Sequence, residues 1–338
     1  METSVNDYDT EQIKYLNEFL NSWHEGHSIT VKTSGSTGIP KNIQLTHEHL
    51  VRSAKRTVQF FNIKSSSRIH CAISFKYIGG KMMIARSLVS GCELTYSEPS
   101  LKPGLPNDNQ RIKLLSIVPA QMSYILQNQH EFNQIDNFLL GGSAIDNRLW
   151  DKIVASGITA WESYGMTETA SHIALRRIIG SSSNRPRFVA MKGIELKTDF
   201  ENRIHIKDKE LVVITNDIAR MYADGSFEII ARKDDIIISG GLKIIPQQVE
   251  TILQRYLYPF STEFYLSSEP DEKWTSRLVL QCVPNPCLTR EEPKSIIKKI
   301  IDVIRDIPQN ILPNFQRPKD IRLIPFLPRN EAGKIIRR

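Results

Sequence analysis

Residues 114–142 read LLSIVPAQMSYILQNQHEFNQIDNFLLGG. The apolar run at 114–118 predicts a strand, the segment at 119–129 predicts a helix, and 137–140 predicts a second strand that leads into a Gly-Gly pair. The same alternation surrounds this stretch, with a strand expected at 69–75 and helices at 79–90 and 146–155. Strands that alternate with helices favour a mainly parallel sheet flanked by helices. The sequence therefore predicts an α/β fold.

The segments on either side of this region show other patterns. Helices are expected at 10–25 and 46–61, where apolar residues recur at helical spacing. Between 187 and 230, short alternating runs are separated by turns at Glu201-Asn202 and Ala223-Asp224-Gly225. This pattern predicts a small β subdomain with antiparallel strands.

After Arg232-Lys233-Asp234-Asp235 the pattern indicates a small α+β domain of about a hundred residues. Its expected elements are helices at 247–257 and 291–306 and strands at 261–267, 277–283 and 321–326. We therefore predict a large N-terminal domain at 1–232, a hinge at 233–235 and a small C-terminal domain at 236–338.

The composition excludes several classes of protein. The chain has 338 residues, of which 40% are hydrophobic and 24% are charged, so it is not a disordered chain and has room for two or three domains. No apolar run approaches the roughly 18 residues that span a bilayer, so no membrane span is expected. The polar N-terminus lacks the apolar core of a signal peptide, and we expect a cytoplasmic protein.

Cysteines and charge narrow the choice of ligand. The four cysteines (Cys71, Cys92, Cys282 and Cys287) lack paired metal-ligand spacing, so reduced thiols without a metal are expected. The net charge of +7 mildly favours anionic ligands. Basic residues gather toward the C-terminus, but no basic patch with interleaved aromatic residues accompanies them. Nucleic-acid binding is therefore not expected.

The strongest local signal for a binding site is the segment Thr33-Ser34-Gly35-Ser36-Thr37-Gly38-Ile39-Pro40-Lys41. Its backbone N–H groups and hydroxyls can wrap a polyphosphate, and Lys41 adds a positive charge. A solvated Ser/Gly linker is the alternative, but such a linker does not need the closing Pro-Lys pair. The loop is not a Walker A motif, because Lys41 is followed by Asn42, and no Gly-x-Gly-x-x-Gly fingerprint indicates a dinucleotide-binding domain.

Four further blocks follow along the chain. They are Gly141-Gly142-Ser143-Ala144; Tyr164-Gly165-Met166-Thr167-Glu168-Thr169; Asn216-Asp217 with Arg232-Lys233-Asp234-Asp235; and Ser239-Gly240-Gly241 with Pro328-Arg329-Asn330-Glu331-Ala332-Gly333-Lys334. Each block alone has an ordinary structural explanation, such as a capped turn or a solvated lysine. In this order, and after the phosphate loop, they resemble the adenylate-forming superfamily of acyl- and aryl-CoA ligases, peptide-synthetase adenylation domains and luciferases.

The resemblance implies a role for each block in the large domain. The loop from Thr33 to Gly38, with Lys41, would hold the phosphates of ATP. The nucleoside would contact Gly141, Gly142, Ser143, Tyr164, Gly165, Asp217 and Arg232, with Tyr164 stacked on adenine and Asp217 on the ribose hydroxyls. Thr167 would contact phosphate, and Glu168 would bind Mg²⁺.

In the small domain the resemblance implies a hinge at Asp234, a tunnel for the CoA thiol at Gly240 and Gly241, and a catalytic lysine at Lys334. Lys334 would bridge the acid and the α-phosphate while acyl-AMP and pyrophosphate form, and the small domain would then turn so that the thiol attacks acyl-AMP. Phosphoryl transfer depends on positioning and charge neutralisation. Signature residues limited to Gly, Ser, Thr, Lys and one Mg²⁺ ligand agree with that chemistry.

Within the superfamily, residues 77–86, 114–122 and 164–176 resemble most the branch of o-succinylbenzoate–CoA ligases of menaquinone biosynthesis. This acid carries a second carboxylate, which a fixed cation or donors must hold. The candidates for that contact are Tyr77, Lys81, Arg86, Ser171 and His172. The alternative for Lys81 and Arg86 is a solvated helix face.

Two other functions remain open at this point. One is a ligase for another aryl or fatty acid, or for a carrier-protein thiol. The other is a homologue that binds nucleotide without turnover on its own. A homodimer is compatible with either function.

The resemblance also implies that the N-terminal region is short. The phosphate loop begins at Thr33, so about one helix precedes it, whereas members of the family generally carry a long region there. We expect the shortened part to be scaffold. The apolar surface that it would cover must then be hidden by residues 10–25, by a smaller sheet or by a second subunit.

Overall fold

The computed structural model describes residues 10–33, 41–272, 274–288, 291–329 and 335–336. Contacts divide the chain into two compact units. Unit 1 comprises Met1–Lys197, His205–Val213 and Met221–Glu228, and unit 2 comprises Thr198–Ile204, Ile214–Arg220 and Ile229–Arg338. The domain limits at 1–232 and 236–338, with a hinge at 233–235, stay a prediction.

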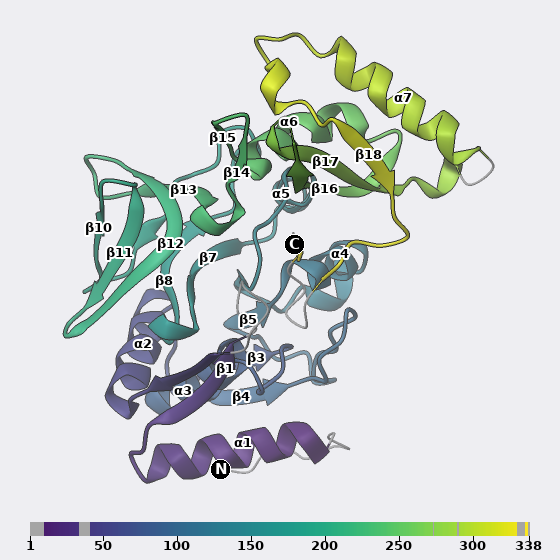
Figure 1. Cartoon of the computed structure of the whole chain (residues 1–338). Coiled ribbons are helices and arrows are strands. Elements are labelled where there is room, and N and C mark those ends of the chain that lie inside the picture. The colour runs from purple at the N-terminus through teal and green to yellow at the C-terminus, as the bar shows by residue number, and fades with distance from the viewer. Residues whose placement is uncertain (1–9, 34–40, 273, 289–290, 330–334, 337–338) are drawn as a thin grey trace. The chain divides into compact units, whose positions relative to one another are not determined.

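A seven-stranded sheet forms the centre of unit 1 (Figure 1). Its strands lie in the order β4 (Glu93–Tyr96), β3 (Arg68–Cys71), β5 (Leu114–Ile117), β6 (Phe138–Leu140), β7 (Ala160–Met166), β8 (Ser171–Arg177) and β9 (Val189–Ala190). The first five strands pair in parallel, whereas β8 and β9 pair antiparallel. The predicted α/β fold with a mainly parallel sheet is confirmed.

Helices cover both faces of this sheet. The helices are α2 (His47–Phe60), α3 (Ile78–Ser90), α4 (Pro119–Gln127) and α5 (Asn147–Ser156), with a short η1 (Gln129–Phe132). Helix α3 packs on β3 and β5, whereas Leu115 and Ile117 of β5 pack with Met122 and Trp150 of α4 and α5. All four residues of β5 are therefore buried, as expected for a strand covered on two sides.

Local sequence explains where these helices begin and end. Thr46 caps α2 by accepting a hydrogen bond from the backbone N–H of His49, and Asp146 caps α5 in the same way. Pro119 begins α4, where its missing N–H costs nothing. Gly157 ends α5 in the left-handed conformation. The predicted helices at 46–61, 79–90, 119–129 and 146–155 are confirmed.

Helix α1 (Thr10–His24) packs on α3, and a hairpin of β1 (Ile29–Thr33) and β2 (Lys41–Leu45) follows it. The side chain of Phe19 is buried. Oε1 of Gln12 accepts hydrogen bonds from the backbone N–H of Phe75 and the hydroxyl of Ser74, both at 3.0 Å. Helix α1 therefore covers part of α3 and of the loop before it.

A four-stranded sheet contributes residues to both units. Its strands β10 (Glu195–Thr198), β11 (Arg203–Asp208), β12 (Leu211–Met221) and β13 (Phe227–Arg232) lie in sequence order. Asn202 and Gly225 adopt positive φ in two of the connections, where the sequence predicts turns. The predicted β subdomain is thus present.

Unit 2 contains a smaller α+β core. The hairpin of β14 (Ile237–Ser239) and β15 (Leu242–Ile244) precedes α6 (Pro246–Leu257), a sheet of β16 (Ser261–Asp271), β17 (Thr275–Pro284) and β18 (Asp320–Leu323), and α7 (Pro293–Asp306). Leu253 of α6, Ile300 of α7 and Leu280 of β17 are buried in one cluster. The α+β pattern predicted for this part of the chain is confirmed.

None of the helices in the described part of the chain combines the length and apolarity that crossing a bilayer requires.

His70 on β3 gives the fold a measurable dependence on pH. Its Nδ1 lies 2.8 Å from the hydroxyl of Thr95, and burial lowers its pKa from 6.5 to about 4. At a pH between these two pKa values, His70 is protonated in the unfolded chain and neutral in the folded chain. Stability therefore falls as the pH drops, by about 3 kcal/mol for this group over the whole interval.

We predict that His70→Gln flattens the loss of unfolding free energy between pH 6.5 and pH 4 in urea titrations. The exposed His130 serves as the control, and His130→Gln should leave the pH dependence of the parent protein unchanged. Parallel pH profiles for His70→Gln and the parent protein would contradict the assignment.

Candidate active site

The carboxyl ends of the parallel strands bring several of the predicted blocks to one edge of the sheet. β4 lies on one side of β3 and β5 lies on the other, so the order in which successive strands are added to the sheet reverses at β3. Open α/β sheets bind ligands at the carboxyl edge near such a reversal. The glycine turn that begins at Gly141 follows β6, and the Tyr164–Glu168 block lies at the end of β7. The sequence predicts both blocks as nucleotide-binding segments through their resemblance to the adenylate-forming superfamily.

The glycine turn lies directly against β7. A Cβ on Gly141 would approach Oγ of Ser163 to 2.9 Å, and this hydroxyl donates a hydrogen bond of 2.8 Å to the carbonyl of Leu140. Gly142 has a φ of +90°, and Ser143 is exposed. The turn therefore exposes backbone beside the residue that precedes Tyr164.

Gly165 marks a very close approach of β7 to β8. The pairing register shifts between Tyr164 and Gly165, and a Cβ on Gly165 would lie 2.3 Å from the carbonyl oxygen of Ser171. The ring of Tyr164 is half-buried and packs edge-on against Phe227 at a centroid distance of 5.5 Å. Glycine at this position lets the aromatic residue and the following turn lie next to β8.

Thr167 and Glu168 lie in a tight turn, η2 (Thr167–Thr169). The hydroxyl of Thr169 accepts a hydrogen bond from the backbone N–H of Met166, and Ala170 and Ser171 adopt positive φ of 50° and 89°. Such backbone is strained for non-glycine residues and persists only where the surroundings fix it. The turn leaves the side chains of Thr167 and Glu168 half-buried.

The donor set suits Mg²⁺ on a nucleotide better than a metal cage built by the protein. In the described ranges no three His, Cys, Asp or Glu side chains gather to hold a metal. Mg²⁺ commonly takes one or two carboxylates and fills its remaining positions with phosphate and water. A single carboxylate at Glu168 fits that pattern.

Two arginines and a glutamate clamp the loop after β6, and the sequence did not reveal them. The carboxylate of Glu162 accepts the backbone N–H of Ile145 at 3.3 Å, and Arg185 donates to the carbonyl of the same residue at 2.8 Å. Arg176 pairs with Glu162 at 2.7 Å. Burial lowers the pKa of Arg185. Contacts with both backbone groups of Ile145 fix the end of the glycine turn.

Three of the five predicted acid-site residues come together beside α3. Nη2 of Arg86 lies 3.2 Å from Oγ of Ser171 and 3.4 Å from Nδ1 of His172. The arginine is only 1% exposed. Burial lowers its pKa to about 10, so it remains a cation at neutral pH. Within the described part of the chain no carboxylate forms an ion pair with Arg86.

Lys81 lies elsewhere. Its Nζ is 5.8 Å from the ring of Tyr15 and 6.0 Å from the ring of Phe19, beneath α1. Five residues separate it from Arg86, which places the two side chains about 140° apart around the helix. Tyr77 is the N-cap residue of α3. Since Lys81 and Arg86 are both buried, the alternative of a solvated helix face is excluded.

In unit 2 the structure places the predicted ribose residues and hinge side by side. Nη1 of Arg232 lies 3.0 Å from the buried carboxylate of Asp217. The same guanidinium is 3.7 Å from Asp234, and the side-chain amide of Asn216 donates to Asp234 at 3.0 Å. The two carboxylates are thus linked through one arginine.

Gly240 and Gly241 form the turn of the β14–β15 hairpin and have φ of 57° and 78°. The N–H of Gly240 donates to the carbonyl of Trp274 at 2.8 Å, and a Cβ on Gly240 would lie 2.8 Å from the Trp274 ring. Glycine is therefore required here both for its backbone conformation and for its lack of a side chain. Trp274 carried no signal in the sequence.

The phosphate loop and the catalytic-type lysine fall mostly outside the described residues. Thr33 pairs with Lys41 at the open end of the β1–β2 hairpin, so the two ends of the loop are held together. Ser34, Gly35, Ser36, Thr37, Gly38 and Lys334 lie outside the described residues, and their roles stay predictions.

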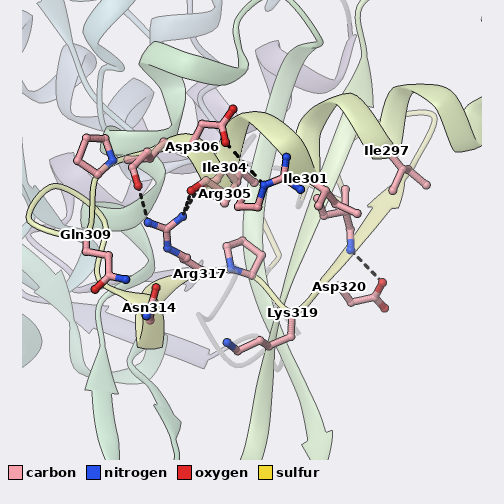
Figure 2. A pocket seen from close by; sticks show the side chains of 14 residues that line it. Ile297, Ile301, Ile304, Arg305, Asp306, Gln309, Asn314, Arg317, Lys319 and Asp320 are labelled. Atoms are coloured by element: carbon pink, nitrogen blue, oxygen red, sulfur yellow. Dashed lines mark hydrogen bonds and ion pairs between the residues drawn. The ribbon is translucent and has the colours of Figure 1, made fainter.

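A separate groove of about 690 Å³ lies in unit 2 between α7 and β18 (Figure 2). Figure 2 shows the guanidinium of Arg317 directed at the carbonyl groups that end α7, including that of Arg305. The guanidinium also donates to the carbonyl of Ile307. Arg317 thus caps the helix. None of the predicted site residues lines this groove.

Residues 30–215, more than half of the chain, match the model of a family described as AMP-binding enzyme. The chain belongs to the AMP-binding enzyme family. Among relatives of this AMP-binding enzyme is the 2-succinylbenzoate–CoA ligase of Listeria innocua, 26% identical over 97% of this chain and 73% of the relative. The ligase of the same name from Lactococcus lactis is 25% identical over 92% of this chain and 70% of the relative.

Solved structures confirm the fold of the AMP-binding enzyme. The acyl-CoA synthetase (AMP-forming)/AMP-acid ligase II-like protein from Dyadobacter fermentans superposes with a TM-score of 0.62 at 26% identity, covering 98% of this chain and 94% of that chain. The o-succinylbenzoate CoA synthetase from Bacillus subtilis, solved with its acyl-adenylate intermediate, superposes with a TM-score of 0.72 at 21% identity. The match covers 91% of this chain and 67% of that chain.

We predict that Gly165→Ala lowers the unfolding free energy of the AMP-binding enzyme by about 2–3 kcal/mol, because its Cβ would overlap backbone atoms of β8 that cannot move aside. Gly157→Ala is the matched control. A φ of 74° would strain an alanine there, but no atom lies within 4 Å of the added Cβ. A loss of about 1 kcal/mol in unfolding free energy is therefore expected. Urea unfolding measures both variants, and equal costs would contradict the close approach.

Proposed function

We propose that this AMP-binding enzyme is an ATP-dependent acid–thiol ligase that adenylates 2-succinylbenzoate and transfers the acyl group to CoA, as menaquinone biosynthesis requires. The family and the CoA ligases among its relatives support this reaction class. The choice of acid rests on one observation, the buried and positively charged Arg86 beside Ser171 and His172.

A buried charge without a counter-ion is costly in a folded protein, by several kcal/mol. The free carboxylate of a dicarboxylic acid would offset that cost at Arg86. It can accept charge-assisted hydrogen bonds from the guanidinium, and the hydroxyl of Ser171 adds a further donor. The other carboxylate of the acid would then be the reacting group. An aryl or fatty acid with a single carboxylate offers no such partner.

ATP, Mg²⁺ and CoA complete the proposed reaction. Mg²⁺ at Glu168 would supply positive charge to the phosphate oxygens. The turn at Gly141 and Gly142 and the ring of Tyr164 would bind the nucleoside, together with Asp217 and Arg232. Gly240 and Gly241 would receive the pantetheine arm of CoA, whose thiol is the second nucleophile.

The proposed reaction has two balanced steps. An oxygen of the acid attacks the α-phosphorus of ATP, the bond to the β-phosphate oxygen breaks, and pyrophosphate leaves. The sulfur of CoA then attacks the acyl carbon of the mixed anhydride and AMP leaves, while the thiol proton passes to solvent. Positioning and charge neutralisation by the protein account for the rate of the first step.

A pyrophosphate-release screen tests the function. The purified protein is supplied with ATP, Mg²⁺, CoA and one acid at a time, namely 2-succinylbenzoate, benzoate, or a medium-chain fatty acid. We expect release with 2-succinylbenzoate to exceed the others by at least tenfold. Preference for a monocarboxylic acid would overturn the substrate, and nucleotide binding without release from any acid would favour the homologue without turnover.

We predict that Arg86→Gln raises the KM for 2-succinylbenzoate by at least about 30-fold, because removing one partner of a buried charge pair costs about 2–5 kcal/mol. Lys81→Gln is the matched control, since Lys81 is also buried and lies on the same helix but faces α1. It should leave this KM within about threefold. Steady-state kinetics with varied acid measures both, and equal effects would contradict the assignment of Arg86.

We predict that Lys334→Ala lowers adenylation by about 10²–10³, the scale expected for one preorganised electrostatic donor. Conversion of supplied acyl-AMP to the thioester should be largely spared. Pyrophosphate release measures the first half-reaction and thioester formation the second. The exposed Lys319 gives the control Lys319→Ala, and equal losses of Lys334→Ala in both half-reactions would contradict the role of Lys334.

A further inference from the structure

His172 lies between two elements that are distant in the chain. The residue is 4% exposed. On one side Nδ1 lies 3.4 Å from Nη2 of Arg86 on α3, and on the other side Nε2 lies 3.1 Å from Oγ1 of Thr57 on α2. Thr57 is fully buried, and its hydroxyl lies 3.4 Å from the carbonyl of Ser53 one turn earlier.

The guanidinium of Arg86 favours one direction for each hydrogen bond of the ring. A guanidinium only donates, so Nδ1 of His172 must accept from Arg86. A neutral imidazole that accepts at Nδ1 carries its proton at Nε2. Nε2 therefore donates to the hydroxyl of Thr57, which leaves the hydroxyl proton for the carbonyl of Ser53. In the other tautomer, Nδ1–H would face the guanidinium of Arg86 and would have only Oγ of Ser171, at 3.4 Å, as its acceptor. The Nε2–H tautomer avoids that repulsion and keeps every contact of the ring.

The surroundings keep His172 neutral. Burial is the largest cause that lowers its pKa well below 6.5, and the nearby cations Arg86 and Arg56 add to it. A proton on Nδ1 would also point at the guanidinium of Arg86. The ring is therefore an obligatory acceptor for that guanidinium at neutral pH.

Helix α2 contacts the segment around His172 at two points. The hydroxyl of Ser53 donates a hydrogen bond of 2.6 Å to the carbonyl of Ala170, in the strained turn that precedes His172. Ser53 and Thr57 lie one turn apart on the same helix, and they contact Ala170 just before β8 and His172 within it. This double attachment fixes the position of the Thr57 hydroxyl relative to the imidazole.

We propose that Thr57 is a positioning residue for the acid site, which fixes His172 in the Nε2–H tautomer and thereby orients the guanidinium of Arg86. One Nη2 hydrogen is directed to the histidine and the other to Ser171, so the remaining face of the guanidinium is set for the second carboxylate of the acid. The tautomer is inferred from the contacts of the ring, whereas its effect on the acid rests on the proposed function.

Nitrogen NMR of the ring tests the tautomer directly. In protein labelled with ¹⁵N-histidine, long-range proton–nitrogen spectra distinguish Nε2–H, Nδ1–H and doubly protonated rings, and the signal lost in His172→Gln identifies His172. We expect the Nε2–H form at neutral pH in the parent protein. An Nδ1–H or doubly protonated ring would overturn the proposal, and this measurement needs no folded variant of Thr57.

Kinetics tests the consequence for the acid. Thr57→Val leaves the buried Nε2–H without an acceptor, and we expect the KM for 2-succinylbenzoate to rise about tenfold while kcat and the KM for ATP stay within about twofold. Thr57→Ser keeps the hydroxyl and should restore the parent KM and tautomer. Parent values for both the KM and the ring signals in Thr57→Val would overturn the proposal.

The experiments distinguish failure of the proposed function from failure of the proposed role of Thr57. If the pyrophosphate screen selects an acid with one carboxylate, the substrate is wrong but the Nε2–H signal persists. If 2-succinylbenzoate is the substrate and His172 has the other tautomer, the function stands and the role of Thr57 falls.

Discussion

The close approach of β7 to β8 at Gly165 is the contact on which the other parts of the site depend. The carbonyl oxygen of Ser171 occupies the space where any other residue would carry a Cβ, so the two strands meet without an intervening side chain. The chain must then reverse within the few residues from Met166 to Ser171. It does so through a short η2 turn followed by two non-glycine residues at positive φ. One glycine thus determines where the turn and the start of β8 lie.

Two sets of residues take their positions from that reversal. On the β7 side, Tyr164 packs against Phe227, and Ser163 lies against the glycine turn after β6. On the β8 side, Ser171 and His172 are brought to the guanidinium of Arg86. The nucleoside and acid sites that we propose are therefore coupled through backbone, and neither can shift far without straining the other.

Buried polar groups would give the proposed acid site its specificity. Arg86 is charged and His172 is neutral, because burial disfavours the ionised imidazole while the guanidinium keeps a pKa of about 10. In the Nε2–H tautomer that we propose for His172, each hydrogen bond in the chain from Arg86 to Ser53 has one direction. A network of this kind tolerates few substitutions, since an unpaired buried donor is costly.

The sequence by itself determined the α/β alternation, the α+β pattern after residue 235 and most helices, because apolar spacing and caps such as Asp146 act over a few residues. It also singled out Gly141, Gly165, Arg86 and His172 as candidates. It did not predict β7, whose Glu162 and Gly165 interrupt the apolar pattern. Only the tertiary structure separated Lys81 from Arg86 and joined Thr57 to His172, which are 115 residues apart. Contacts between residues so far apart in the chain depend on how helices and strands pack, so a local sequence pattern cannot predict them.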